Sequence, residues 1–282
     1  MIVIADGGST KADWRIVLNG STQQVSSTIG FNPFFFTPKA IEEELNRTFV
    51  NEFPATEATK VYFYGAGCSD AYRCSIIEEG LQPIFPNAKV IVDHDLMAAA
   101  RATCGGKPGV ACILGTGSNS CNFDGEKITD HITNLGHLLG DEGSGSYLGK
   151  MLIRGYFYRE FPDDIKKEFE DKYPFEQREL INRIYDYNTS NVFLASFAKF
   201  LSDHKDHIYI QQLVNKAFSE FIDRHVRKYK NHNTLPIHFV GSIAFHFKEI
   251  LNLVLQQRNL QLGMVIKKPI DHLVEYHINF EL

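Results

Sequence analysis

Short apolar runs that end in a glycine-rich turn recur along the chain. Residues 2–5 form such a run, which is followed by Asp6 and by Gly7-Gly8-Ser9-Thr10-Lys11, and apolar positions resume over residues 12–18. Asn19-Gly20 comes next, and this dipeptide is a strong short signal for a β-hairpin. The pattern therefore predicts a strand, a glycine turn, a second strand, and a hairpin into a third strand over residues 23–28.

The same order of elements returns in the second part of the chain. After the stretch 105–109, residues 110–114 form an apolar run, Gly115-Thr116-Gly117-Ser118 form a turn, and residues 119–123 resume before Asp124-Gly125. The first turn begins at residue 6 and the second at residue 115, an offset of 109 residues. This recurrence indicates an internal duplication, with a boundary at the stretch 105–109.

The remaining segments alternate between strand and helix patterns, which is typical of an α/β fold. Thr37 before Pro38 predicts the start of a helix that runs to residue 52. The strand expected over residues 237–240 also ends in a glycine turn, Gly241-Ser242. Further strands are expected at 61–64, 89–92 and 265–266, and helices at 71–85, 96–103, most of 144–229, 242–257 and 270–279.

Composition narrows the class of protein without identifying it. The chain has 282 residues, 44% of them hydrophobic, which supplies the cores of two ordinary domains and excludes a largely disordered chain. Lys and Arg number 29 against 34 Asp and Glu, and the net charge of −5 argues against a nucleic-acid partner. No signal-peptide pattern, membrane-spanning run, disulfide framework or zinc-ligand spacing is evident. We expect a cytoplasmic protein with no membrane partner.

The three glycine turns share a chemistry. Glycine lets the backbone approach an anion closely, and Ser and Thr hydroxyls add donors, so each turn is suited to phosphate. None of them is a Walker A motif or the G-x-G-x-x-G of a dinucleotide fold. A single glycine turn at a strand end is usually structural. Three such turns, two of them duplicated, favour a phosphate-binding protein.

In this order, the turns resemble those of the sugar kinase/Hsp70/actin superfamily. The resemblance implies an α/β fold with two ribonuclease-H-like domains (the actin-like ATPase fold) and an interdomain ATP cleft. The N-terminal domain would comprise residues 1–107 and 270–282, and the C-terminal domain, with a helical insertion, residues 108–269. Leu114-Gly-Thr-Gly-Ser-Asn119 and Gly136-His-Leu-Leu-Gly-Asp-Glu-Gly-Ser144 are similar to the N-acetylglucosamine kinase branch of the BadF/BadG/BcrA/BcrD ATPase family.

The resemblance also implies ATP and Mg²⁺ as cofactors. Nucleotide-binding residues would be Gly7, Gly8, Ser9, Thr10 and Lys11 in a first phosphate loop, Gly115, Thr116, Gly117 and Ser118 in a second, and Gly241 and Ser242 beside adenosine. Asp6 would hold Mg²⁺ directly or through water, because this ion prefers oxygen ligands. The alternative for Asp6 is a turn residue that bonds its own backbone.

Asp95 is the candidate catalytic residue. It follows the predicted strand and precedes a helix, so one interpretation is a helix N-cap. The resemblance instead places the family's catalytic Asp here, where a carboxylate takes the proton of the attacking hydroxyl. Asp93 is the fallback base or a second carboxylate near the metal.

Candidate sugar-binding residues lie in two segments. Asn32 carries both a donor and an acceptor for sugar hydroxyls, although Asn before Pro is also ordinary turn chemistry. The resemblance adds Asn134, Gly136, His137 and Asp141, besides Asp95 itself. Glu142 stays open between a substrate, metal or structural role, and the pair Asp141-Glu142 is an alternative cap for the helix that starts near Ser144.

The resemblance implies an ATP-dependent kinase of an amino sugar, N-acetylglucosamine to its 6-phosphate. One alternative is an ATPase activator of a dehydratase, for which Cys104 is the suggestive residue. Another is a non-catalytic sugar-binding regulator, against which Asp6 and Asp95 argue. A homodimer is the default for such an enzyme. The basic residues at 224–230 are expected to form a solvated helix face, and Phe34-Phe35-Phe36 to pack in the core.

Overall fold

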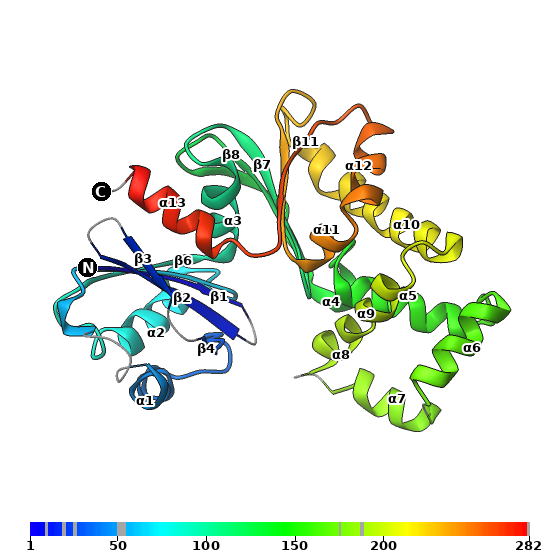
Figure 1. Ribbon diagram of the computed structural model, residues 1–282, viewed down its shortest axis with the longest axis horizontal. Coiled ribbons are helices and arrows are strands. Elements are labelled where there is room, and N and C mark those ends of the chain that lie inside the picture. The colour runs from blue at the N-terminus through cyan, green and yellow to red at the C-terminus, as the bar shows by residue number, and fades with distance from the viewer. Residues whose placement is uncertain are drawn as a thin grey trace. The chain divides into compact units, whose positions relative to one another are not determined.

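The computed structural model describes residues 1–8, 11–18, 21–24, 27–49, 55–174, 176–186 and 189–280. Ser9 and Thr10 of the predicted first phosphate loop and the hairpin dipeptide Asn19-Gly20 lie outside these residues. The chain divides into two compact units (Figure 1). Unit 1 consists of Met1–Lys107, Gly125–Lys127 and Lys268–Leu282, and unit 2 of Pro108–Asp124 and Ile128–Lys267.

Unit 1 is built on a sheet with the strand order β3-β2-β1-β5-β6, and β4 pairs with β2. Strand β1 is antiparallel to β2 and parallel to β5, which in turn is parallel to β6. Parallel strands end at the same edge of a sheet, so Gly7, Gly65 and His94 lie in neighbouring register positions. The strands are β1 (Ile2–Gly7), β2 (Lys11–Leu18), β3 (Ser21–Gln24), β4 (Thr28–Ile29), β5 (Lys60–Gly65) and β6 (Lys89–His94).

Helices cover both faces of this sheet, α1 and α2 on one and α3 and α13 on the other (Figure 1). Thr37 caps the first of them as predicted, since its side chain accepts the N–H of Ala40. The predicted helix from residue 71 ends at Leu81 instead of residue 85, because Pro83 cannot continue it. The helices are α1 (Pro38–Thr48), η1 (Ala55–Glu57), α2 (Ala71–Leu81), α3 (Asp95–Cys104) and α13 (Ile270–Phe280).

Unit 2 repeats the arrangement at the centre of the first sheet. Its strand order is β11-β10-β7-β8-β9, in which β7 is antiparallel to β8 and parallel to β10. The middle strands β1 and β7 therefore have the same kinds of neighbours, in agreement with the duplication inferred from the turns. The strands are β7 (Gly109–Leu114), β8 (Ser118–Phe123), β9 (Ile128–His131), β10 (Ile237–Val240) and β11 (Leu262–Ile266).

A helical segment follows β9, as the sequence predicts. Its aromatic side chains, among them Phe169, Phe197 and Phe200, are buried in the core of unit 2. The helix expected over residues 242–257 is divided in two at Phe247. The helices are α4 (Gly136–Leu139), α5 (Gly145–Phe157), α6 (Asp163–Lys172), α7 (Gln177–Ile184), α8 (Ser190–Ser196), α9 (Ala198–Asp203), α10 (Ile208–Arg224), η2 (Val226–Lys228), α11 (Ser242–His246) and α12 (Lys248–Gln256).

Surface residues test two smaller predictions. Arg224, Arg227 and Lys228 are exposed while His225 and Tyr229 are buried, so the basic side chains of residues 224–230 are solvated as predicted, although α10 ends at Arg224 and they do not form one helix face. The core placement of the phenylalanine cluster is wrong for Phe34 and Phe35, which are 56% and 63% exposed, because the turn after Asn32 directs them outward.

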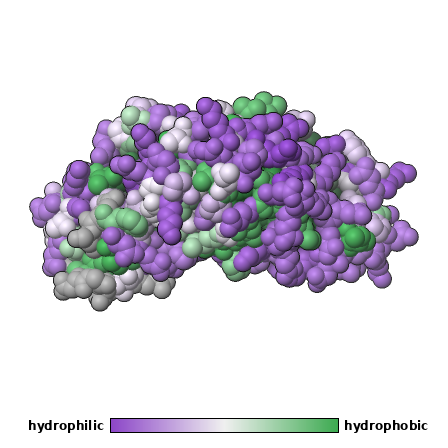
Figure 2. All heavy atoms as spheres, turned by 90° about the horizontal axis from the view of Figure 1, so that it is seen from above, coloured by the Kyte–Doolittle hydropathy of each residue, from purple (hydrophilic) through white to green (hydrophobic). Residues whose placement is uncertain are grey.

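No helix among the described residues is long and apolar enough to cross a membrane. The face drawn in Figure 2 is covered mainly by hydrophilic residues.

Candidate functional site

Asp6 lies at the carboxyl end of β1, at an edge of the sheet rich in carboxylates. Its register partners are Asp13 on β2 and Tyr64 on β5. Burial, the charge of Asp95 and the charge of Asp13 raise the pKa of the Asp6 carboxyl to about 7, and Lys268 partly opposes them. The basic residue Lys268 does not offset the burial of Asp6 and the two neighbouring carboxylates. A buried carboxylate in such surroundings is suited to bind a cation.

Two basic side chains, Lys11 and Lys268, contact Asp13 at this edge. Its carboxylate accepts a hydrogen bond from Lys268 Nζ at 2.6 Å and lies 3.1 Å from Lys11 Nζ. Burial would raise the pKa of Asp13, but Lys268 and Lys11 outweigh it and hold the pKa below its usual value. Asp13 therefore keeps Lys11, the predicted phosphate contact, beside the first turn.

The backbone of the first turn is held close to the sheet. A Cβ on Gly7 would lie 2.6 Å from Phe63 Cζ, so only glycine fits without a shift of that ring. Gly7 O accepts the N–H of Ala66 at 2.7 Å, and Gly8 N donates to Lys11 O at 2.9 Å. These contacts bring the turn after β1 against the turn after β5.

Asp95 is the first residue of α3, and the interpretation of its side chain as the helix cap is wrong. The N-cap is His94, whose Nδ1 accepts the N–H of Met97 at 3.0 Å. Asp93 Oδ1 accepts the N–H of His94 at 2.8 Å. Burial raises the pKa of the Asp95 carboxyl, while His94 and the N–H of Leu96 oppose the rise. A carboxylate with a raised pKa that is spared from capping is suited to accept a proton.

Asn32 lies in the turn after β4, against the turn after β5. Its Oδ1 accepts the N–H of Phe34 at 3.0 Å. Gly67 has a φ of 86°, and a Cβ there would lie 2.6 Å from Asn32 Oδ1. No acceptor is recorded for Asn32 Nδ2 among the residues that the structure describes, so this amide is available to a ligand hydroxyl.

In unit 2, residues 115–118, here called the second phosphate loop, direct their carbonyls inward. Gly115 O accepts the N–H of Gly145 at 2.8 Å and Thr116 O that of Ser146 at 3.0 Å, both at the start of α5. Gly117 O accepts the N–H of Gly115 at 3.0 Å. The described residues provide no recorded acceptor for the N–H groups of Thr116 and Gly117. Two adjacent free N–H groups are the donors that a phosphate needs.

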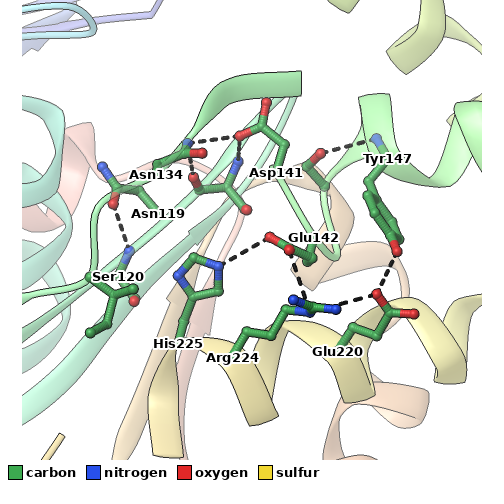
Figure 3. Close-up of polar contacts among 12 residues, drawn as sticks. Asn119, Ser120, Asn134, Asp141, Glu142, Tyr147, Glu220, Arg224 and His225 are labelled. Carbon is green, nitrogen blue, oxygen red and sulfur yellow. Dashed lines mark hydrogen bonds and ion pairs between the residues drawn. The ribbon is translucent and has the colours of Figure 1, made fainter. Parts of the chain in front are cut away.

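Residues 134–144, here called the sugar segment, contact this loop through two side chains (Figure 3). Asp141 Oδ1 accepts the N–H of Ser118 at 3.0 Å and an amide hydrogen of Asn134 at 2.8 Å. Asn134 Nδ2 also donates to Ser118 O at 2.5 Å, and Asn134 Oδ1 accepts the N–H of Gly136 at 2.8 Å. These bonds bring together four residues that the sequence predicts to bind nucleotide or sugar, namely Ser118, Asn134, Gly136 and Asp141.

His137 and Glu142 form no recorded hydrogen bond with the second phosphate loop among the described residues, and their partners lie on other elements of unit 2. His137 O accepts a hydrogen bond from Lys150 Nζ at 3.0 Å, and His137 Nε2 lies 3.0 Å from Ser190 Oγ. Glu142 is 8% exposed and is directed toward α10, where it lies 3.2 Å from His225 Nε2 (Figure 3). The alternative interpretation of Asp141 and Glu142 as the cap of α5 is wrong, because Ser144 Oγ accepts the N–H of Tyr147 instead.

The third glycine turn, at the end of β10, borders a pocket. Gly241 has a φ of 122°, and a Cβ there would lie 2.2 Å from Leu114 O, so the turn packs against the end of β7. Ser242 and Ile243 line a pocket of about 350 Å³ in unit 2. Its other wall comes from α8 and α9, and includes Ala195 and Lys199. No motif in the sequence predicts that wall, because α8 and α9 belong to the helical insertion.

Comparison with solved structures decides the family. A putative N-acetylglucosamine kinase from Porphyromonas gingivalis is 38% identical to this chain, with a TM-score of 0.93 over 100% of both chains. The chain belongs to this family of sugar kinases. No protein-family model and no curated protein matches it. The narrower assignment to the BadF/BadG/BcrA/BcrD family stays a prediction.

Two more distant structures support the fold of this sugar kinase. A putative N-acetylglucosamine kinase from Chromobacterium violaceum is 15% identical, with a TM-score of 0.70 over 98% of each chain. A ROK family glucokinase from Streptomyces griseus, solved with glucose and AMPPNP, is 12% identical, with a TM-score of 0.57 over 98% of this chain and 97% of that one. The predicted α/β fold of two actin-like ATPase domains is confirmed.

Proposed function

We propose that this protein transfers the γ-phosphoryl group of ATP to the 6-hydroxyl of N-acetylglucosamine. The observation that carries the proposal is the full-length match at 38% identity to the Porphyromonas gingivalis protein. The candidate residues of both units support it, because they supply a base, a carboxylate for a cation and free N–H donors. The alternatives, a dehydratase activator and a non-catalytic sugar regulator, have no such observation in their favour.

ATP would use residues of both units. In unit 2 the free N–H groups of Thr116 and Gly117 would bind phosphate oxygens, and the pocket beside Ser242 would hold adenosine. In unit 1 the backbone around Gly8 and the ammonium group of Lys11, whose side chain is 53% exposed, would contact the phosphates. Backbone donors and one or two lysines explain how an acidic protein binds a polyphosphate.

The carboxylates at the edge of the first sheet fit Mg²⁺. Burial and the charges of Asp95 and Asp13 raise the pKa of Asp6, Lys268 opposes the rise only in part, and oxygen ligands are those that this ion prefers. Among the described residues no cluster of three His, Cys, Asp or Glu side chains forms a complete cage. Asp6 would therefore hold the ion as one ligand among water and phosphate oxygens. When bound, Mg²⁺ neutralises phosphate charge during transfer.

Asp95 would act as the base. The 6-hydroxyl oxygen of the sugar forms a bond to the γ-phosphorus, the bond from that phosphorus to the β–γ bridging oxygen breaks, and ADP leaves. The hydroxyl proton passes to the Asp95 carboxylate, whose raised pKa favours its acceptance. Asp93 stays the fallback base, and its Oδ1 accepts the N–H of His94.

Residues of both units would bind the sugar. Asn32 Nδ2 would donate to a ring hydroxyl, and the backbone at Gly136 and the side chains of His137 and Asp141 would contact the other hydroxyls or the acetamido group. A homodimer and a cytoplasmic location also remain our predictions. Light scattering after size-exclusion chromatography measures the oligomeric state.

A coupled ADP-release assay tests the function directly. N-acetylglucosamine, N-acetylmannosamine, glucosamine, N-acetylmuramic acid and glucose are compared, each with Mg²⁺ and with EDTA. We expect the highest kcat/KM for N-acetylglucosamine, by at least about tenfold, which one well-placed polar contact can supply. Activity should vanish in EDTA. A preference for glucose, or no activity on any hexosamine, would contradict the proposal.

A further inference from the structure

Two side chains of the sugar segment hold the backbone of a single residue, Ser118, at the end of the second phosphate loop. Asp141 accepts the N–H of Ser118 and Asn134 donates to the C=O of the same residue, so both backbone groups of Ser118 are occupied (Figure 3). A hydrogen bond of 2.8 Å between Asn134 Nδ2 and Asp141 Oδ1 ties the two side chains together. Ser118 and Asp141 are 3% and 5% exposed, so water competes little for these bonds.

The hydrogen-bonding capacity of Asn134 is nearly used up by these contacts. A side-chain amide has two hydrogens and one carbonyl oxygen. Both acceptors of its hydrogens, Ser118 O and Asp141 Oδ1, lie within unit 2, and its oxygen accepts the N–H of Gly136. Asn134 therefore has no free donor for a sugar hydroxyl, although it lies in the sugar segment.

The backbone conformation of Asp141 and the space beside Gly117 both favour the hydrogen bonds of Asp141 to Ser118 and Asn134. Asp141 has a φ of 59°, a left-handed conformation that costs free energy for a residue other than glycine. A Cβ on Gly117 would lie 3.0 Å from Asp141 Oδ1, so glycine at this position leaves room for the carboxylate. The start of α5 holds the carbonyls of Gly115 and Thr116 from the other side. The loop is thus fixed at both ends, with the N–H groups of Thr116 and Gly117 left free between them.

We propose that Asn134 is a positioning residue for nucleotide binding, which fixes the Ser118 peptide and thereby presents the N–H groups of the second phosphate loop to ATP. This inference rests on the proposed function, because it takes that loop as the nucleotide site. It departs from the sequence prediction for Asn134, which was contact with the sugar.

Binding of AMPPNP with Mg²⁺ in the complete absence of sugar tests this role by calorimetry. Asn134→Ala removes both donors, and Asn134→Leu removes them while keeping the approximate size of the side chain and adding no charge. We expect the Kd for AMPPNP to rise at least about tenfold in both variants, since a backbone group of the loop loses its partner. Asn122→Ala is the matched control. Asn122 lies on β8, the strand that begins at Ser118, but its amide donates to Thr129, and we expect a Kd within twofold of the unaltered protein.

The outcomes separate this inference from the function on which it rests. Thermal unfolding and circular dichroism first establish that each variant is folded, and either variant suffices for the comparison. An unchanged Kd for AMPPNP would overturn the positioning role, and a raised KM for the sugar beside it would make Asn134 a sugar contact. Failure of the unaltered protein to bind AMPPNP would overturn both proposals.

Discussion

The Asp6 carboxylate is expected to destabilise the protein when no metal is bound. Its pKa is about 7 in the folded protein against an ordinary value of 3.8, which corresponds to a penalty of roughly 4 kcal/mol at about 1.36 kcal/mol per pKa unit. The folded state binds this proton more tightly than the unfolded state. The penalty is therefore absent below pH 3.8, grows as the pH rises, and is complete above about pH 7. Asp6→Asn removes the charge and should remove the penalty.

Thermal unfolding in EDTA between pH 4 and pH 8.5 measures this effect. We expect Asp6→Asn to match the unaltered protein near pH 4 and to exceed its Tm by roughly 5–10 °C at pH 8. Mg²⁺ should raise the Tm of the unaltered protein at pH 8 but not that of the variant, and the variant should lose turnover. Asp130→Asn, at an exposed position on β9, serves as the control and should show no such gap. A variant less stable than the unaltered protein at pH 8, or a gap that does not change with pH, would refute the reasoning.

Two further predictions concern the base and the glycine turns. Asp95→Asn should lower kcat by about 10²–10⁴-fold, the usual contribution of a positioned base, while calorimetry finds the Kd for AMPPNP within threefold; near-normal turnover would remove Asp95 from the mechanism. Gly241→Ala should lower the Tm by several degrees in a thermal scan, because its Cβ would lie 2.2 Å from Leu114 O at a φ of 122°. Gly115→Ala has open space around its Cβ and should keep its Tm within about 2 °C, so equal losses in the two variants would contradict this account.

Local signals in the sequence predicted the framework of the fold. An apolar run followed by glycine defines the ends of β1, β7 and β10, because both the strand and the turn depend on a few consecutive residues. The recurrence of these turns then predicted where the strands of the second sheet begin, at β7. The predicted strand over residues 237–240 agrees with β10.

Side-chain partners were harder to predict than backbone elements. Three polar residues, Asp93, His94 and Asp95, compete for the start of α3, and only the orientation of the His94 ring assigns the cap. The partner of Glu142 is His225, which lies 83 positions away at the C-terminal end of α10 and carries no motif. Asn134 was predicted to face the sugar, whereas its hydrogen bonds within the fold are set by the loop that packs beside it.

Phosphorus NMR of the reaction products tests the central claim most directly. The protein is incubated with ATP, Mg²⁺ and N-acetylglucosamine, and in parallel with the 6-deoxy sugar. We expect ADP and N-acetylglucosamine 6-phosphate in equal amounts from the first reaction, and no phosphorylated sugar from the second. Phosphate on a different hydroxyl, or ADP with inorganic phosphate and no sugar phosphate, would contradict it.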